Sequence, residues 1–158
     1  MVGFTSYSLE NDKVFKRNLN KAIAAVDDLR FAMGEISRDI FKTTKQNFIL
    51  KTTGKYPPLS PQYAKYKEKV KPNLPILVFS GRLRDSVTNN GNKDTIRIIG
   101  KKSLVQGTRV PYGRYVQEGT SKMPERKFLF IDNAQSLRIE RILADYVSSK
   151  LEVLGNVS

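Results

Sequence analysis

Apolar residues recur every three or four positions through the first third of the chain. The set is Phe15, Leu19, Ile23, Val26, Leu29, Met33, Ile36 and Ile40, continued more loosely by Phe48. This spacing places the set on one stripe of a helix, and no Pro interrupts it. We therefore expect one long helix over residues 12–50, with Asp12 as a candidate cap. Residues 1–11 read as an extended or irregular arm.

A helix of that length would be long for its domain. About 36 residues at 1.5 Å each span roughly 54 Å, which exceeds the usual diameter of a domain of this size. Such a helix would project beyond its domain or lie against a neighbouring subunit. Gly34 offers the alternative of two shorter helices with a bend between them.

Residues 51–75 are rich in Pro and Lys. Gly54 is a candidate end for the long helix. Ser60 followed by Pro61 is a typical helix start, because Ser caps the first turn and Pro fits the first helical position. A short helix is expected there, ended by Pro72.

Residues 76–132 read as strands and loops. Leu83, Asp85 and Val87 alternate with residues 84, 86 and 88, Asn89–Asn92 favour a turn, and residues 95–99 alternate again. This pattern predicts a hairpin, with residues 103–110 as a candidate third strand.

Two further helical segments complete the pattern. Residues 111–119 suggest one or two helical turns stopped by Gly119, and residues 133–154 form a helix with Asn133 as a candidate cap. The order predicts an α+β fold, in which the long N-terminal helix and the C-terminal helix pack on a small, mainly antiparallel sheet. A chain of 158 residues fits a single domain.

Composition argues against an enzyme, because the chain contains neither Cys nor His. Disulfides and thiolate chemistry are excluded, and the usual general base and the commonest metal ligand are missing. No phosphate-binding loop, dinucleotide fingerprint or nucleophile elbow is present. We therefore expect no catalytic residue, no metal and no cofactor. A small hydrolase that uses Asp or Lys is the remaining enzymatic alternative.

Three polar groups resemble sites without the required spacing. Asp27 and Asp28 are neighbours, so on a helix they point to different faces. The run 89–94 lacks the spaced carboxylates of a calcium loop and reads as a turn. Ser80 and Ser86 have no His to activate them.

The net charge of +13 is concentrated in the middle of the chain. Residues 51–127 hold 17 Lys and Arg against five Asp and Glu, whereas the rest holds 11 against 10. A localised basic surface suggests a nucleic acid or an acidic protein partner, and a solvated, solubilising surface is the alternative. The candidate basic residues are Lys65, Lys67, Lys69, Lys71, Arg97, Lys101 and Lys102.

Tyr63 and Tyr66 alternate with Lys in the predicted short helix. Such interleaving could stack bases and hold phosphates, or the two rings could share an inward face. No apolar run approaches the roughly 18 residues of a membrane span, and the N-terminus does not resemble a secretory signal. No membrane partner is therefore expected.

Four short motifs occur in a fixed order between residues 54 and 132. The first two are Tyr56, Pro58, Leu59 and Ser60, then Ile76, Leu77, Ser80, Gly81, Leu83 and Ser86. The last two are Tyr112, Gly113, Gln117 and Gly119, then Met123, Pro124, Arg126, Phe128 and Leu129. Their order and spacing resemble the virion-morphogenesis, or tail-completion, proteins of tailed bacteriophages. Three positions depart from that pattern: Tyr56 replaces the usual Trp, Gly113 an Ala, and Val116 a common His.

The resemblance implies a structural protein of the virion neck, where tail meets head, with no enzymatic activity. Such a tail-completion or tail-terminator subunit would form a ring with itself, commonly of six copies, after assembly in the host cytoplasm. Its partners would be other neck, connector and tail-tube or sheath proteins, with passing genomic DNA as a further candidate. The rival hypothesis is a basic nucleic-acid-binding module.

The resemblance also gives residues 112–129 expected roles. Gly119 would cap a short element, and Thr120–Met123 would form a mobile bridge that meets a neighbouring subunit. Arg126 would hold a carboxylate or a carbonyl. Phe128 and Leu129 would be buried, either as an anchor within the chain or against a neighbour.

Overall fold

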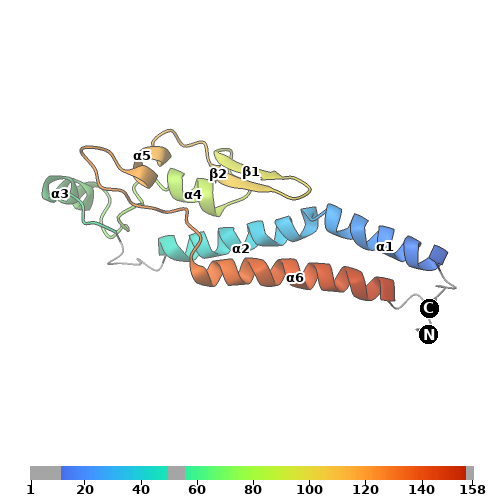
Figure 1. Cartoon of the computed structure of the whole chain (residues 1–158). Coiled ribbons are helices and arrows are strands. Elements are labelled where there is room, and N and C mark those ends of the chain that lie inside the picture. The colour runs from blue at the N-terminus through green and yellow to red at the C-terminus, as the bar shows by residue number, and fades with distance from the viewer. Residues whose placement is uncertain (1–11, 50–55, 156–158) are drawn as a thin grey trace, which may run out of the picture.

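The structure is a computed structural model that describes residues 12–49 and 56–155. Its elements, in chain order, are α1 (Asp12–Asp27), α2 (Arg30–Ile49), α3 (Pro61–Val70), α4 (Arg82–Thr88), β1 (Thr95–Ile99), β2 (Leu104–Thr108), α5 (Gly113–Glu118) and α6 (Asn133–Gly155). Figure 1 shows α1, α2 and α6 as a long helical body, with the short helices and the hairpin gathered on one side of α2. The expected arm at 1–11 and the expected stop at Gly54 lie outside the described residues.

The predicted single helix over residues 12–50 is wrong, because two helices occupy this region. The break falls at Asp28 and Leu29, whereas Gly34 lies inside α2. The Asp28 carboxylate accepts a bond from the Arg30 backbone N–H at 3.1 Å, and the Leu29 N–H donates to the Lys101 carbonyl at 2.7 Å. A side-chain cap and a contact from the hairpin therefore end one helix and begin the next.

The sheet consists of β1 and β2, which pair antiparallel with Thr95 opposite Thr108 and Ile99 opposite Leu104. The predicted strand at residues 83–88 is wrong, because these residues form α4. Its buried residues are Leu83, Ser86 and Val87. Ser86 and Val87 follow Leu83 by three and four positions, which is the spacing of residues on one face of a helix. The predicted third strand is instead the second strand of the hairpin.

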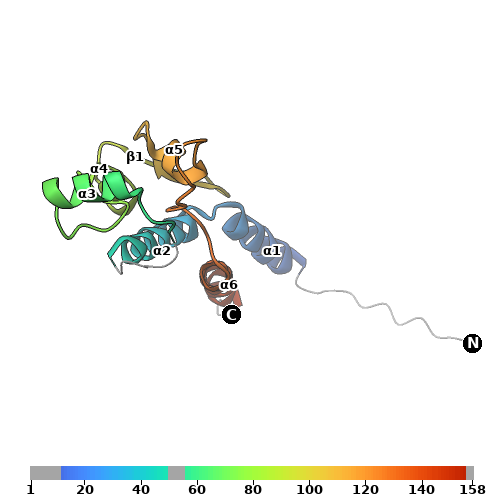
Figure 2. The same ribbon diagram turned by 90° about the vertical axis from the view of Figure 1, so that its left-hand side faces the viewer.

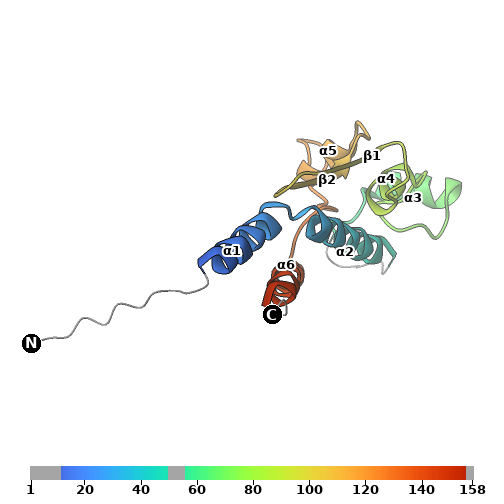
Figure 3. The same ribbon diagram turned by 90° about the vertical axis from the view of Figure 1, so that its right-hand side faces the viewer.

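Helix α2 forms the middle layer of the molecule. The hairpin and α4 pack on one side of it, while α6 packs on α1 and α2 from the other side. Figures 2 and 3 show the same order, with the sheet above α2 and α6 below it. The α+β class is confirmed, although the C-terminal helix lies across α2 from the sheet. Helix α6 begins at Asn133, but its cap is Asp132, whose carboxylate accepts the Gln135 N–H at 2.7 Å.

The hydrophobic core lies near the C-terminal end of α2. Its buried side chains are Phe48, Val78, Leu83, Val87, Val110 and Phe128. The core therefore joins α2 to α4 and to the segments that flank α5. None of the described helices is long and apolar enough to cross a membrane.

Candidate functional site

The four motifs come together beside the core, in what we call the motif junction: residues 56–60, 76–87 and 112–129. An apolar pocket of about 360 Å³ lies at its surface, bordered by α3, α4 and α5. Leu59 is half-buried at this pocket and Tyr112 is exposed at its edge. Ser60 caps α3, accepting the Tyr63 N–H at 3.4 Å as predicted.

Arg126 is the main polar link of the junction. Its side chain is almost fully buried, and it donates to the carbonyls of Pro57 at 3.1 Å and Pro58 at 2.9 Å. Beside it, the Tyr56 hydroxyl donates to the Lys127 carbonyl at 3.1 Å. Partial burial raises the pKa of Tyr56. The resemblance allowed a carboxylate or a carbonyl as the partner of Arg126, and the structure shows carbonyls, in a bond that joins segments about 70 residues apart in sequence.

Gln117 fixes the extended segment that leads to α6. Its Oε1 accepts the N–H groups of Phe128 at 3.0 Å and Leu129 at 3.1 Å, and its Nε2 donates to the Leu129 carbonyl at 2.7 Å. Phe128 is 2% exposed, and its ring centroid lies 6.3 Å from that of Phe48. Phe128 is therefore an anchor within the chain.

Gly119 ends α5 as predicted. Its φ is +76°, and a Cβ there would lie 2.7 Å from the Glu125 backbone nitrogen. Only Gly fits such a position readily. Thr120 and Met123 exchange backbone bonds of 2.7 and 3.2 Å, so a paired turn stands where the sequence suggested a mobile bridge. Pro124 follows it and is exposed.

The remaining motif residues hold α4 in place. Ser80 is exposed, and its Oγ accepts the Arg82 N–H at 3.4 Å. Gly81 has a φ of +82° where the chain enters the helix. The Ser86 hydroxyl is fully buried, donates to the Leu83 carbonyl at 2.8 Å and lies 2.6 Å from Thr108 Oγ1.

Arg126, Gln117 and Ser86 at the junction therefore all bond to backbone groups of their own chain. Ser86 is enclosed by its own hydrogen bonds. No group of three or more His, Cys, Asp or Glu that could hold a metal ion occurs in the described part of the chain.

The prediction that Lys67 faces a partner is wrong. Lys67 is buried on α3, and its Nζ donates to the carbonyls of Pro75 and, at 3.2 Å, Ile76. Burial lowers the pKa of its ammonium group. Lys67 thus closes the loop after α3, while Lys65, Lys69 and Lys71 are exposed around it.

The other candidate basic residues also have structural bonds. Arg97 Nε donates to Ser37 Oγ at 2.8 Å, between the hairpin and α2. Lys102 and Lys101 lie 2.8 and 3.8 Å from the Asp27 carboxylate, and the hydrogen bond from Lys102 lowers the pKa of Asp27. The predicted basic residues do not form one surface, because α3 and the hairpin turn are well separated (Figure 1).

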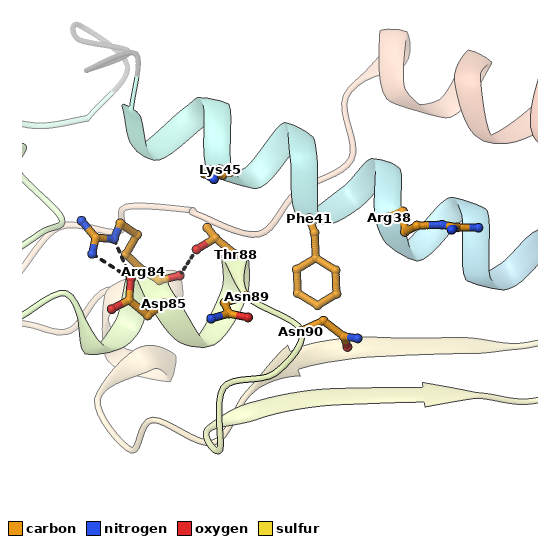
Figure 4. Close-up of a pocket in the computed structure, with 8 residues that line it drawn as sticks. All are labelled: Arg38, Phe41, Lys45, Arg84, Asp85, Thr88, Asn89 and Asn90. Atoms are coloured by element: carbon orange, nitrogen blue, oxygen red, sulfur yellow. Dashed lines mark hydrogen bonds and ion pairs between the residues drawn. The ribbon is translucent and has the colours of Figure 1, made fainter.

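An open groove between α2 and α4 was not predicted. It encloses about 580 Å³, and Figure 4 shows Arg38 and Lys45 on α2, with Arg84 on α4. Arg38 pairs with Glu35, and Arg84 pairs with Asp85 at 2.8 Å, so much of the positive charge is already compensated. The groove could not be predicted because one of its walls is α4, and these residues were predicted to form a strand.

The comparison with protein families found a match that covers most of the chain. Residues 10–148 match the phage virion morphogenesis family, and this range contains all four motifs. Searches of curated proteins and of solved structures found no significant match. The match covers most of the chain, and we conclude that the protein belongs to the phage virion morphogenesis family.

Proposed function

We propose that the protein is a structural subunit of the phage neck, a tail-completion or tail-terminator protein that caps the tail and takes part in joining it to the head. It would act as a ring of copies, without enzymatic activity. Its partners would be neck, connector and tail-tube or sheath proteins. Family membership supports a role in virion assembly, and the neck position follows from the resemblance of the motifs.

One observation carries the proposal: the polar motif side chains bond to their own chain, while large apolar side chains remain uncovered elsewhere. The uncovered residues include Ile23, Val26, Phe31, Ile98, Val105, Leu137 and Leu151. Several exposed apolar surfaces on one small chain are typical of a subunit that contacts other proteins. Weak contacts repeated around a ring would sum to strong attachment.

The proposal is tested in the phage and with purified protein. Without the gene, full heads and tails that lack their cap should accumulate unjoined in electron micrographs of lysates. Native mass measurement of the purified protein should show a closed oligomer. Normal joining in its absence would refute the proposed function.

A nucleic-acid-binding role is the second candidate, because one surface observation favours it. Tyr63 and Tyr66 are exposed on α3, and Tyr66 stacks on Phe79 at 6.2 Å, close to the free lysines of that helix. Replacing Lys65, Lys69 and Lys71 together by Gln should then weaken DNA binding and flatten its salt dependence, since fewer counterions would be released. No retention of DNA by the native protein at low salt would dismiss this candidate.

A further inference from the structure

The hairpin has one face covered and one face bare. Inward-facing Arg97 and Gln106 both bond to Ser37 on α2. The alternate residues form the outer hairpin face, which we define as Ile96, Ile98, Val105 and Gly107. Ile98 lies opposite Val105, and they are 61% and 53% exposed.

The outer hairpin face is also flat. Gly107 lies opposite Ile96, and a Cβ built on Gly107 would have no heavy atom within 4 Å. A two-stranded sheet is marginally stable by itself, so cover on this face would stabilise it. The exposed apolar side chains and the exposed backbone at Gly107 both favour contact with another protein surface.

Helix α6 offers a matching surface on the other side of the molecule. Its packed side uses Arg138 and Tyr146, which bond to Asp39 and to the Asp28 carbonyl. The outer α6 face, defined as Leu137, Ala144 and Leu151, points away from these contacts. Seven residues are nearly two helical turns, so the three lie in one line; Leu137 is 63% and Leu151 48% exposed.

The charges around the two faces are complementary. Four basic residues flank the ends of the hairpin: Lys93, Lys101, Lys102 and Arg109. Three exposed carboxylates lie near the line on α6, those of Glu140, Asp145 and Glu152, and the exposed cations of this helix are Arg141 and Lys150. None of the three carboxylates has an ion-pair partner within the described residues. Lys101 and Lys102 are partly compensated by Asp27.

We propose that the outer hairpin face of one copy docks on the outer α6 face of the next copy. This inference rests on the proposed function and names the contact that builds its ring. The two faces lie on opposite sides of α2 (Figures 1 and 2). A contact between two different faces is heterologous, and it closes into a ring when the rotation per copy allows.

Two charge-introducing variants test the contact. Ile98→Asp disables the hairpin face, and Leu137→Asp disables the α6 face. Both residues are more than half exposed, so each variant should keep the circular-dichroism spectrum of the native chain, and each alone should be monomeric by native mass measurement. Val105→Asp repeats the first test on the partner strand. Val70→Asp on α3, where Val70 is 45% exposed, is the matched control and should assemble normally.

The mixture of the two variants is the decisive experiment. Each retains one intact face, so an equimolar mixture should form one-to-one dimers of the two variants and nothing larger. Variants that remain monomeric when mixed, or that still assemble alone, would overturn the inference. If the native protein is an oligomer and the variants give either of these overturning results, the contact is refuted and the proposed function still stands. If the native protein is a monomer, the proposed ring is refuted.

Discussion

The motif junction and the two outer faces use their side chains in opposite ways. At the junction, Arg126 and Phe128 are 5% and 2% exposed, and both are committed to their own chain. On the outer faces, Ile98 and Leu137 are each more than 60% exposed among the residues that the structure describes.

This difference separates the residues that identify the family from those available to partners. The motifs join residues 56–58 to 126–127 and fix the approach to α6. The residues of such a motif stabilise the fold, and they need not form an interaction surface. Substitutions at the junction should therefore change stability, and substitutions on the outer faces should change association.

The largest effect is expected for Phe128→Ala. Removing a buried aromatic ring from a packed core costs about 3–5 kcal/mol of unfolding free energy. Urea unfolding at equilibrium measures this loss as a lower midpoint with little change in slope. Phe130→Ala is the matched control, because Phe130 is 38% exposed, and its cost should be below about 1 kcal/mol. Equal losses for the two variants would contradict the burial pattern.

Arg126→Met comes next. The substitution keeps the bulk of the side chain but leaves the Pro57 and Pro58 carbonyls without their donor. We expect a loss of about 1.5–3 kcal/mol, the usual contribution of hydrogen bonds made by a charged group. The same urea experiment measures it.

Lys127→Met is the neighbouring control for Arg126. Lys127 is exposed and pairs with Glu125 at 3.5 Å, and exposed pairs contribute at most about 1 kcal/mol. If Arg126→Met were as mild as Lys127→Met, the junction would not depend on the buried guanidinium.

Gly119→Ala should cost about 1–3 kcal/mol, because its backbone conformation is nearly exclusive to Gly. The new Cβ would also meet the Glu125 backbone at 2.7 Å. Thermal unfolding followed by circular dichroism measures the effect. Gly91→Ala is the control, since a Cβ there would make only an ordinary contact, 3.6 Å from Asn89 Oδ1, and its melting temperature should not fall. A tolerated Ala at 119 would show that the turn relaxes.

Local signals in the sequence predicted much of the junction. The cap at Ser60 and the stop at Gly119 were recognisable from residue type and spacing. Both depend on nearby residues, so a short stretch of sequence contains what is needed to infer them. The role of Arg126 came instead from the resemblance, which left a carboxylate and a carbonyl open as its partner, and its bond spans about 70 positions.

The failures involved contacts that the pattern of a residue's own helix or strand does not contain. The break at Asp28 depends on the Lys101 carbonyl, more than 70 positions away. Lys67 is buried because a later loop supplies two carbonyls. Residues 83–88 fit both a strand and a helix, and packing on α2 decides between them. The outer faces are the sides of the hairpin and of α6 that do not pack on α2. The local sequence pattern does not show which sides these are.

The smallest predicted effect concerns the Arg82–Asp94 pair, which connects α4 to the start of β1, between the two regions compared. Arg82 donates to both carboxylate oxygens of Asp94, at 2.7 and 3.1 Å. This hydrogen bonding lowers the pKa of Asp94 in the folded protein. A lowered folded pKa gives stability that is present above the unfolded value near 4 and is lost as pH falls through the folded pKa. Asp94→Asn should therefore lower the urea midpoint at pH 7, and the difference from the native protein should shrink below about pH 4. Glu118→Gln, which removes a carboxylate from an exposed pair with Arg114, should change the midpoint little at pH 7. A difference for Asp94→Asn that stays constant from neutral to strongly acidic pH would mean that the bond to Arg82 does not stabilise the connection between helix and hairpin.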